Sequence, residues 1–177
     1  CSDKTGGVET VKGVCQLKPI IPNISLICTV YNESQTVGPF VESIFSMHAL
    51  PGEIVIVDGG SSDQTVEIIY NCIQQHEFQH RSRLIIEPTC NLRHCPGPIA
   101  RGRNIAILNA QHEIIACTDA GCLLDADWLR RITEPLIKDP NIDAVGGNYY
   151  PQAITYFQKC AASIWHIPQV GSYPDGF

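Results

Sequence analysis

The chain has 177 residues, of which 44% are hydrophobic and 17% are charged, and its formal net charge at pH 7 is −6. This size and composition fit one globular domain with a real core and leave little room for a second full domain. The negative charge argues against broad electrostatic binding to nucleic acid, so a bound anion would need local cations. No apolar run approaches the roughly 18 residues that a transmembrane helix needs.

The sequence contains 9 cysteines, which is an odd number. Three of them fall inside segments predicted below to be core elements: Cys28, Cys72 and Cys117. This placement disfavours a disulfide framework and favours a reducing, cytoplasmic location. Cys90 and Cys95, like Cys117 and Cys122, have a spacing within the looser range of zinc ligands, but neither pair sits in a knuckle of turn residues, so a structural zinc is not expected.

The first part of the chain is predicted to be a tail followed by a strand and a helix. Residues 1–22 show no sustained periodicity and end in prolines, which indicates a tail with at most a short edge strand around residues 8–14. An apolar, strand-like run follows at residues 24–30. Apolar residues then recur on one helical face from Val37 to Phe45, and Pro39 is predicted to lie in the first turn of that helix.

A second strand and helix are predicted next. Residues 49–53, with Pro51 and Gly52, are predicted to form a turn into a buried strand at residues 54–57, which ends in the polar turn 58–63. Ser61 or Ser62 is the predicted cap of the following helix. The residues of that helix predicted to point inward are Val66, Ile69, Tyr70 and Ile73.

Further strands and helices alternate along the rest of the chain. A strand at residues 84–86 leads through a loop rich in proline and cysteine (87–98) into a helix at 99–110. A fourth strand ends at Thr118-Asp119, and Asp125 or Asp127 is predicted to start a helix around Trp128. A short strand is predicted at 143–147. The apolar face of a last helix is predicted to contain Ile154, Phe157, Cys160, Ala161 and Ile164.

This alternation predicts an α/β fold, a three-layer Rossmann-like sandwich with a mostly parallel central sheet. The turns at 29–33, 58–63 and 118–121 would then meet at one edge of the sheet, close to the cations Arg93, Arg101 and Arg103. Acidic groups that suit a metal or a ribose would thus lie near arginines that suit a diphosphate. Taken singly, each turn also fits ordinary loop chemistry, and Asp119 alone fits a turn cap. The glycine-rich motifs of dinucleotide folds and of phosphate-binding loops are missing from the sequence, which disfavours hydride transfer and ATP hydrolysis.

Several segments together resemble the family 2 glycosyltransferases, which have the A-type nucleotide-sugar-binding fold. The segments are ISLICTVYNE at 24–33, EIVIVDGGSSDQT at 53–65, Arg103-Asn104, and TDAGC at 118–122. The resemblance implies a nucleotide-diphospho-sugar transferase domain at residues 23–150, followed at 151–177 by a helix and the start of a truncated acceptor region. It also implies transfer of a sugar, with inversion, from a UDP- or GDP-sugar to an acceptor hydroxyl.

The resemblance assigns donor-binding roles to these residues: Thr29, Tyr31, Glu33, Asp58, Arg101, Arg103 and Asp119. The first three would cradle the nucleoside, and Asp58 would hydrogen-bond the base. Arg103, or Arg101 beside it, would contact the nucleotide. Asp119 would bind the ribose and a Mg²⁺ or Mn²⁺ ion on the diphosphate.

The sequence departs from the family pattern at two places. Gly121 replaces the second acid of the Asp-x-Asp motif, so metal ligation rests on Asp119 unless Asp125 or Asp127 reaches the site, and weak metal affinity is expected. The family places its catalytic base in a later segment, so the base is expected beyond Phe177. Asp175 is a poor candidate because it lies in a Pro-Gly turn at the terminus.

Two other functions remain open at this point. The chain fits a non-catalytic nucleotide-binding module, either degenerate or truncated, which Gly121 and the missing base favour. A nucleotidyltransferase is disfavoured because the turn after the first strand lacks a glycine-rich basic loop. The acceptor is not identifiable. Trp165 and His166 fit an ordinary core role better than contact with a membrane surface, although peripheral membrane association remains an alternative.

Overall fold

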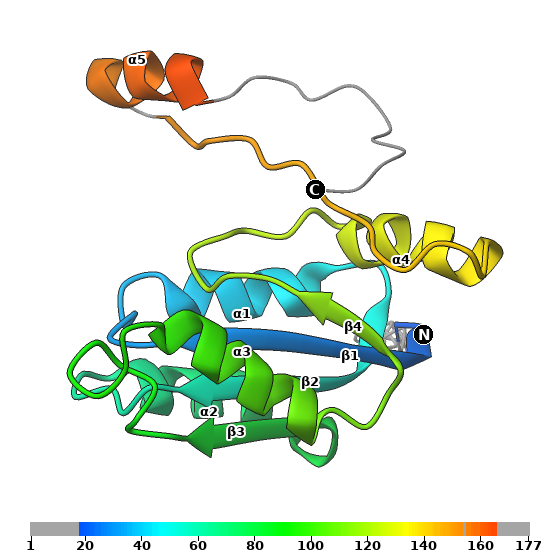
Figure 1. Ribbon diagram of the computed structural model, residues 1–177, viewed down its shortest axis with the longest axis horizontal. Coiled ribbons are helices and arrows are strands. Elements are labelled where there is room, and N and C mark those ends of the chain that lie inside the picture. Colours follow the sequence, from blue (N-terminus) through cyan, green and yellow to red (C-terminus); the bar gives the residue numbers. More distant parts are fainter. Residues whose placement is uncertain (1–17, 154, 166–177) are drawn as a thin grey trace, which may run out of the picture. The chain divides into compact units, whose positions relative to one another are not determined.

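The computed structural model describes residues 18–153 and 155–165 (Figure 1). The elements in chain order are β1 (Ile20–Val30), α1 (Val37–Ser46), β2 (Leu50–Asp58), α2 (Thr65–Gln75), a 3₁₀ turn (Gln79–Arg81), β3 (Ser82–Ile86), α3 (Pro98–Asn109), β4 (Ile114–Cys117), α4 (Trp128–Lys138) and α5 (Tyr156–Trp165). Contacts divide the chain into two compact units, and the second begins at Ala144. The sequence placed this boundary after residue 150.

The first unit contains a four-stranded sheet in the order β3-β2-β1-β4. Every pairing in it is parallel: Val30 lies opposite Asp58, Asp58 opposite Ile86, and Ile27 opposite Cys117. The arrowheads of β3 and β4 accordingly point to the same side in Figure 1. The predicted α/β class with a parallel sheet is confirmed, and the turns that follow these strands lie at one edge.

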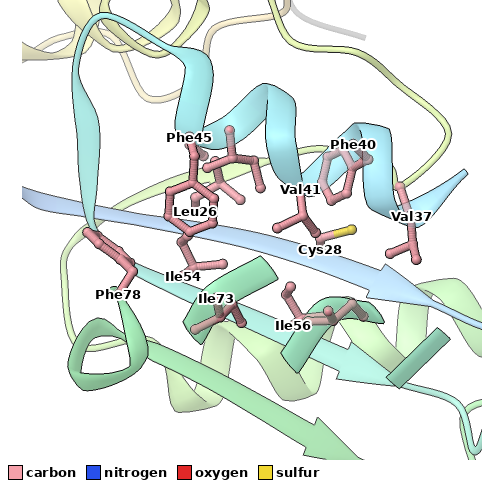
Figure 2. Packing of buried hydrophobic residues seen from close by; sticks show 14 of the residues in the cluster. Leu26, Cys28, Val37, Phe40, Val41, Phe45, Ile54, Ile56, Ile73 and Phe78 are labelled. Atoms are coloured by element: carbon pink, nitrogen blue, oxygen red, sulfur yellow. The ribbon is translucent and has the colours of Figure 1, made fainter. Parts of the chain in front are cut away.

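Helices cover both faces of this sheet because the strands alternate the direction of their side chains. On one face, Leu26 and Cys28 of β1 pack with α1, α2 and Leu129 of α4, and Figure 2 shows part of this cluster. On the other face, Ile27 and Val57 pack with Ala106 of α3. The sheet thus separates two apolar layers, and together they form the predicted three-layer sandwich.

The periodicity predicted α1 well and α2 less well. The buried residues of α1 are the predicted ones: Val37, Phe40, Val41, Ile44 and Phe45. In α2, Ile69 and Ile73 are buried, but Tyr70 is 56% exposed, so its predicted inward position is wrong. The prediction of a serine cap is also wrong. Helix α2 begins after Gln64, and the carboxylate of Asp63 accepts the Thr65 N–H at 3.0 Å in place of a serine hydroxyl.

Both central strands extend further toward their amino ends than expected. Strand β1 begins at Ile20, inside the predicted tail, and β2 begins at Leu50, so Pro51 and Gly52 lie in a strand and not in a turn. The physical reason is close packing of the two backbones: a Cβ on Gly52 would lie 2.2 Å from the carbonyl oxygen of Pro22. The predicted edge strand at residues 8–14 lies outside the described residues.

The later part of the chain differs from the prediction in one element. No strand forms at residues 143–147, where all but one residue is exposed and no neighbouring strand offers hydrogen bonds. Helix α4 begins directly after Asp127, as predicted, but that carboxylate lies beside His48 and Arg130 and does not cap the helix. Helix α5 also forms as predicted. Its Phe157 is 81% exposed, and Ile154 lies outside the described residues.

A buried carboxylate holds the strands together at the edge opposite their carboxyl ends. Glu53 of β2 accepts a hydrogen bond from the Ser25 hydroxyl at 2.6 Å, pairs with Arg83 of β3, and accepts the Gln111 N–H just before β4. Burial alone would raise the pKa of Glu53, but these hydrogen bonds outweigh it and hold the pKa below its ordinary value. This network stabilises the sheet near the amino ends of its strands, away from their carboxyl ends.

Two further properties of the described residues bear on the sequence predictions. None of the helices described is long and apolar enough to cross a lipid bilayer. The cysteines within the described residues are all free thiols, and burial raises the pKa of Cys28.

Candidate functional site

A cavity of about 300 Å³ opens at the carboxyl edge of the sheet. It is lined by residues from the ends of β1, β2 and β4 and from the loop between β3 and α3: Thr29, Val30, Tyr31, Glu33, Val57, Cys90, Asn91, Leu92, Pro98, Ile99, Asp119, Ala120 and Gly121. Four predicted site residues, Thr29, Tyr31, Glu33 and Asp119, are therefore in one cavity. Asp58, Arg101 and Arg103 are not among the lining residues.

The loop after β1 is held in place by the turn after β2. Asn32 has a left-handed backbone with φ of 54°, and its N–H donates to the Ser61 hydroxyl at 2.8 Å. In return the Ser62 N–H donates to the Asn32 side-chain oxygen at 2.9 Å. Asparagine tolerates the left-handed region better than most residues. These bonds fix the backbone next to Tyr31, a cavity-lining residue that is 38% exposed.

A second pair of hydrogen bonds joins the same two segments. The Glu33 N–H donates to the Thr65 hydroxyl at 2.8 Å, and the Ser34 N–H donates to the Asp63 carboxylate at 3.1 Å. Hydrogen bonding, first of all from the Thr65 hydroxyl, lowers the pKa of Asp63 to about 2. Asp63 is therefore ionised at neutral pH, and the cavity wall that includes Glu33 is anchored on the start of α2.

Asp58 supports this wall from behind. It is fully buried, and its carboxylate accepts the N–H groups of Gly60 at 2.9 Å and Ser61 at 2.8 Å as well as the Ser61 hydroxyl. The Ser61 hydroxyl thereby turns its free lone pair toward the Asn32 N–H. A direct bond from Asp58 to a base, as the resemblance implies, would require this buried carboxylate to become accessible, because Asp58 does not line the cavity.

The two arginines differ in what they contact. Arg103 of α3 forms an ion pair with Asp119, and this hydrogen bond raises the pKa of the Arg103 guanidinium. Arg103 Nε is buried and has no hydrogen-bond partner in the described part of the chain. Arg101 instead donates from Nε to the Thr89 hydroxyl at 3.0 Å, in the β3–α3 loop. Arg103 is therefore the arginine placed next to the cavity acid.

The β3–α3 loop contributes a wall that the sequence reasoning missed. Asn91 is 5% exposed, and its Nδ2 donates to the carbonyl oxygens of Gly59 at 2.8 Å and Pro88 at 2.6 Å. Its Oδ1 accepts the Arg93 N–H at 3.1 Å and lies 2.9 Å from His94 Nδ1. The available signal was an asparagine inside the proline- and cysteine-rich loop that follows β3, a setting where asparagine commonly bonds nearby backbone.

The residues present fit a divalent cation only in part. Asp119 has a side chain that is 61% exposed at the cavity, but no group of three or more His, Cys, Asp or Glu side chains able to hold a metal occurs among the described residues. Gly121 adds no ligand, and a Cβ built on it meets nothing within 4 Å. A Mg²⁺ or Mn²⁺ ion here would take one protein carboxylate and complete its shell with ligand oxygens and water.

A parallel α/β sheet with a cavity over its carboxyl edge, and an acid where β4 ends, is the architecture of the A-type nucleotide-sugar transferases. The structure resembles, at a TM-score of 0.56 and 23% identity, a mannosyltransferase from Pyrobaculum calidifontis in complex with GDP-Man and Mn²⁺, over 72% of this chain and 34% of that one. It resembles S. aureus TarS in complex with UDP at a TM-score of 0.53 and 19% identity, over 74% of this chain and 38% of that one. At these identities the likeness establishes the fold.

The family follows from the sequence comparison. The model of glycosyl transferase family 2 matches residues 25–167, and the chain belongs to this family. It is also 32% identical over 128 residues to the poly-beta-1,6-N-acetyl-D-glucosamine synthase of Staphylococcus epidermidis. That match covers 72% of this chain and 29% of the synthase, so the chain spans less than a third of the length of this curated relative. The resemblance inferred from the motifs is confirmed.

Proposed function

We propose that this domain binds the donor in a glycosyl transfer, in which a sugar passes from a nucleoside-diphosphate sugar to an acceptor hydroxyl. The observation that carries the proposal is the polarity of the cavity. Val57 at the end of β2, Leu92 after β3 and Tyr31 near Gly59 give it an apolar and aromatic part, whereas Asp119 follows β4, which is separated from β2 by β1 in the sheet. A nucleoside diphosphate has the same two parts, a flat base and a charged tail.

The base would lie at the end of β2, against Tyr31 and the β3–α3 loop, because a flat ring gains most from an aromatic and apolar wall. The ribose and diphosphate would extend toward the end of β4. Glu33, which follows β1, and Thr29, near the end of that strand, also line the cavity and would offer oxygens to the ribose hydroxyls. Arg103, which lies beside Asp119, would donate to the diphosphate; a small shift toward an anion would also give its buried Nε a partner.

A Mg²⁺ or Mn²⁺ ion, when bound, would offset the negative charge that develops on the departing nucleoside diphosphate. Asp119 would hold it, and Gly121 leaves the affinity dependent on the diphosphate oxygens. Asp119 alone would repel a diphosphate, so we expect nucleotide binding to depend on the cation. The Mn²⁺ and GDP-Man of the mannosyltransferase and the UDP of TarS support a donor of UDP- or GDP-sugar type.

The remaining features are proposed on the family resemblance alone. They are inversion at the anomeric carbon, a catalytic base from a segment outside the donor cavity, and a cytoplasmic location with peripheral contact to a membrane surface. A nucleotide-binding module without catalysis is the alternative, and Gly121 is the observation that favours it, because it removes one metal ligand.

Thermal unfolding with a panel of nucleoside diphosphates tests the proposal, since a ligand that binds only the folded chain raises its melting temperature. We expect UDP or GDP with Mn²⁺ to stabilise the chain, and the effect to fall when EDTA is added. Failure of both nucleotides, with stabilisation by unrelated ligands, would reject the donor site. Donor hydrolysis separates the two functions, because a binding module would bind the nucleotide sugar without consuming it.

A further inference from the structure

We propose that Asn91 is a positioning residue for nucleobase recognition: it latches the β3–α3 loop onto the turn after β2 and thereby forms the wall against which the base lies. This inference rests on the proposed function. Nothing in the predicted donor set includes Asn91, and its side chain acts through the loop and not on the ligand.

Asn91 has no hydrogen-bonding group left for a ligand. Its two N–H donors are used by the carbonyl oxygens of Gly59 and Pro88, and its oxygen is used by Arg93 and His94. An asparagine amide offers two donors and one oxygen with two lone pairs. Asn91 lines the cavity, but it cannot contact a base without breaking one of its own loop bonds.

The latch closes on Gly59, whose missing side chain leaves room for the loop. A Cβ on Gly59 would lie 2.4 Å from the carbonyl oxygen of Cys90 and 3.3 Å from the Tyr31 ring. The backbone of the loop therefore occupies the space where any other residue at position 59 would place its side chain. The Cys90 backbone approaches the sheet at this point only because residue 59 is glycine.

The latch positions residues that line the cavity. Cys90 and Leu92, on either side of Asn91, both line the cavity, and the Tyr31 ring lies near the same point, since it would be 3.3 Å from a Cβ on Gly59. The gap between Tyr31 and the loop is consequently set by the Asn91 to Gly59 bond. A change in this gap would alter how well a base fits, while leaving the Asp119 end of the cavity unchanged. The latch should therefore determine base affinity and base selectivity, and not diphosphate binding.

Calorimetric titration of the full chain tests this with UDP, GDP and inorganic pyrophosphate, each with Mn²⁺. The variant Asn91→Ala removes the donors to Gly59 and Pro88, and Gly59→Ala forces the Cys90 backbone away by steric contact. Each variant should lower the affinity for the better-bound nucleotide by at least about tenfold and reduce the difference in affinity between UDP and GDP. The affinity for pyrophosphate should stay within about twofold of the wild-type value. The double variant should lose little more than either single one, because both break the same contact.

Ser25→Ala is the matched control. It removes a buried side-chain hydrogen bond to Glu53 at the opposite edge of the sheet, so it should lower stability without changing either affinity. Nucleotide affinity that is unchanged in both latch variants would overturn the proposed role of Asn91 and leave the proposed donor site intact. An equal loss of pyrophosphate binding would also overturn it, since the role would then be general support of the fold. A wild-type chain that binds no nucleotide would overturn the proposed function, and the latch with it.

Discussion

Replacing Gly121 with aspartate should create a second metal ligand at the cavity. A Cβ at this position meets no atom within 4 Å, and the Gly121 backbone is outside the left-handed region, so the new side chain can be accommodated without strain. The carboxylate would stand two residues after Asp119, in the same exposed turn. Gly121→Asp is therefore expected to tighten binding of a divalent cation.

The size of the effect follows from simple electrostatics. Two unit charges about 4 Å apart in water attract by about 1 kcal/mol, and a divalent cation doubles this to about 2 kcal/mol. Loss of water from the exposed carboxylate and the cation offsets part of the gain. A net gain of about 1.4 kcal/mol remains, which corresponds to about tenfold tighter binding.

The assay is electron paramagnetic resonance of free Mn²⁺, titrated against the chain with the nucleoside diphosphate at saturation. Asn71→Asp is the control, because it adds the same charge on the exposed part of α2, away from the lining residues. The control should leave the Mn²⁺ affinity unchanged within about twofold. Mn²⁺ affinity that is equal or weaker in Gly121→Asp would refute the placement of the cation at Asp119.

Three further changes test other parts of the account. Ser61→Ala removes the acceptor of the Asn32 N–H and should weaken nucleotide binding about fivefold in calorimetry, roughly the effect of one lost hydrogen bond. Tyr31→Ala removes the aromatic wall and should cost about tenfold in nucleotide affinity with no effect on pyrophosphate, so an equal loss of both would contradict the base position. Glu53→Gln should lower the free energy of unfolding at pH 7 by about 1–2 kcal/mol in urea titration. Because the folded pKa of Glu53 is depressed, its contribution is complete above its ordinary pKa of about 4.3 and is lost as pH falls through the lower folded value, so the gap between wild type and variant should narrow below about pH 4.

The parts of the fold that could be predicted were those set by hydrophobic pattern. The five buried residues of α1 follow the helical period, and the doubly buried strands at 24–30 and 54–57 have no polar alternation, so both were evident from the sequence. The amino end of β2 was missed because Pro51 and Gly52 normally signal a turn, and that of β1 because the prolines at 19 and 22 indicated a tail. The place of Pro51 and Gly52 in a strand depends on the neighbouring backbone at Pro22, which no local pattern reports.

The candidate site was also predictable only in part. Thr29, Tyr31, Glu33 and Asp119 were placed together because strand ends in a parallel sheet share an edge. The inward turn of the Asp58 carboxylate was not predictable, because it depends on hydrogen bonds with Gly60 and Ser61 in three dimensions. The loop wall was missed for a similar reason: its docking depends on a long-range bond to Gly59.

The central claim is that a nucleoside diphosphate lies in this cavity with its cation at Asp119. Amide NMR of the chain with Mn²⁺ and the bound nucleotide tests it most directly, because the paramagnetic ion broadens signals from nearby residues. The account predicts loss of the Ala120 and Gly121 signals, and much weaker broadening at Gly52, which lies six residues before the end of β2 and hence about 20 Å from that edge. Broadening at Gly52 with Gly121 unaffected would contradict it.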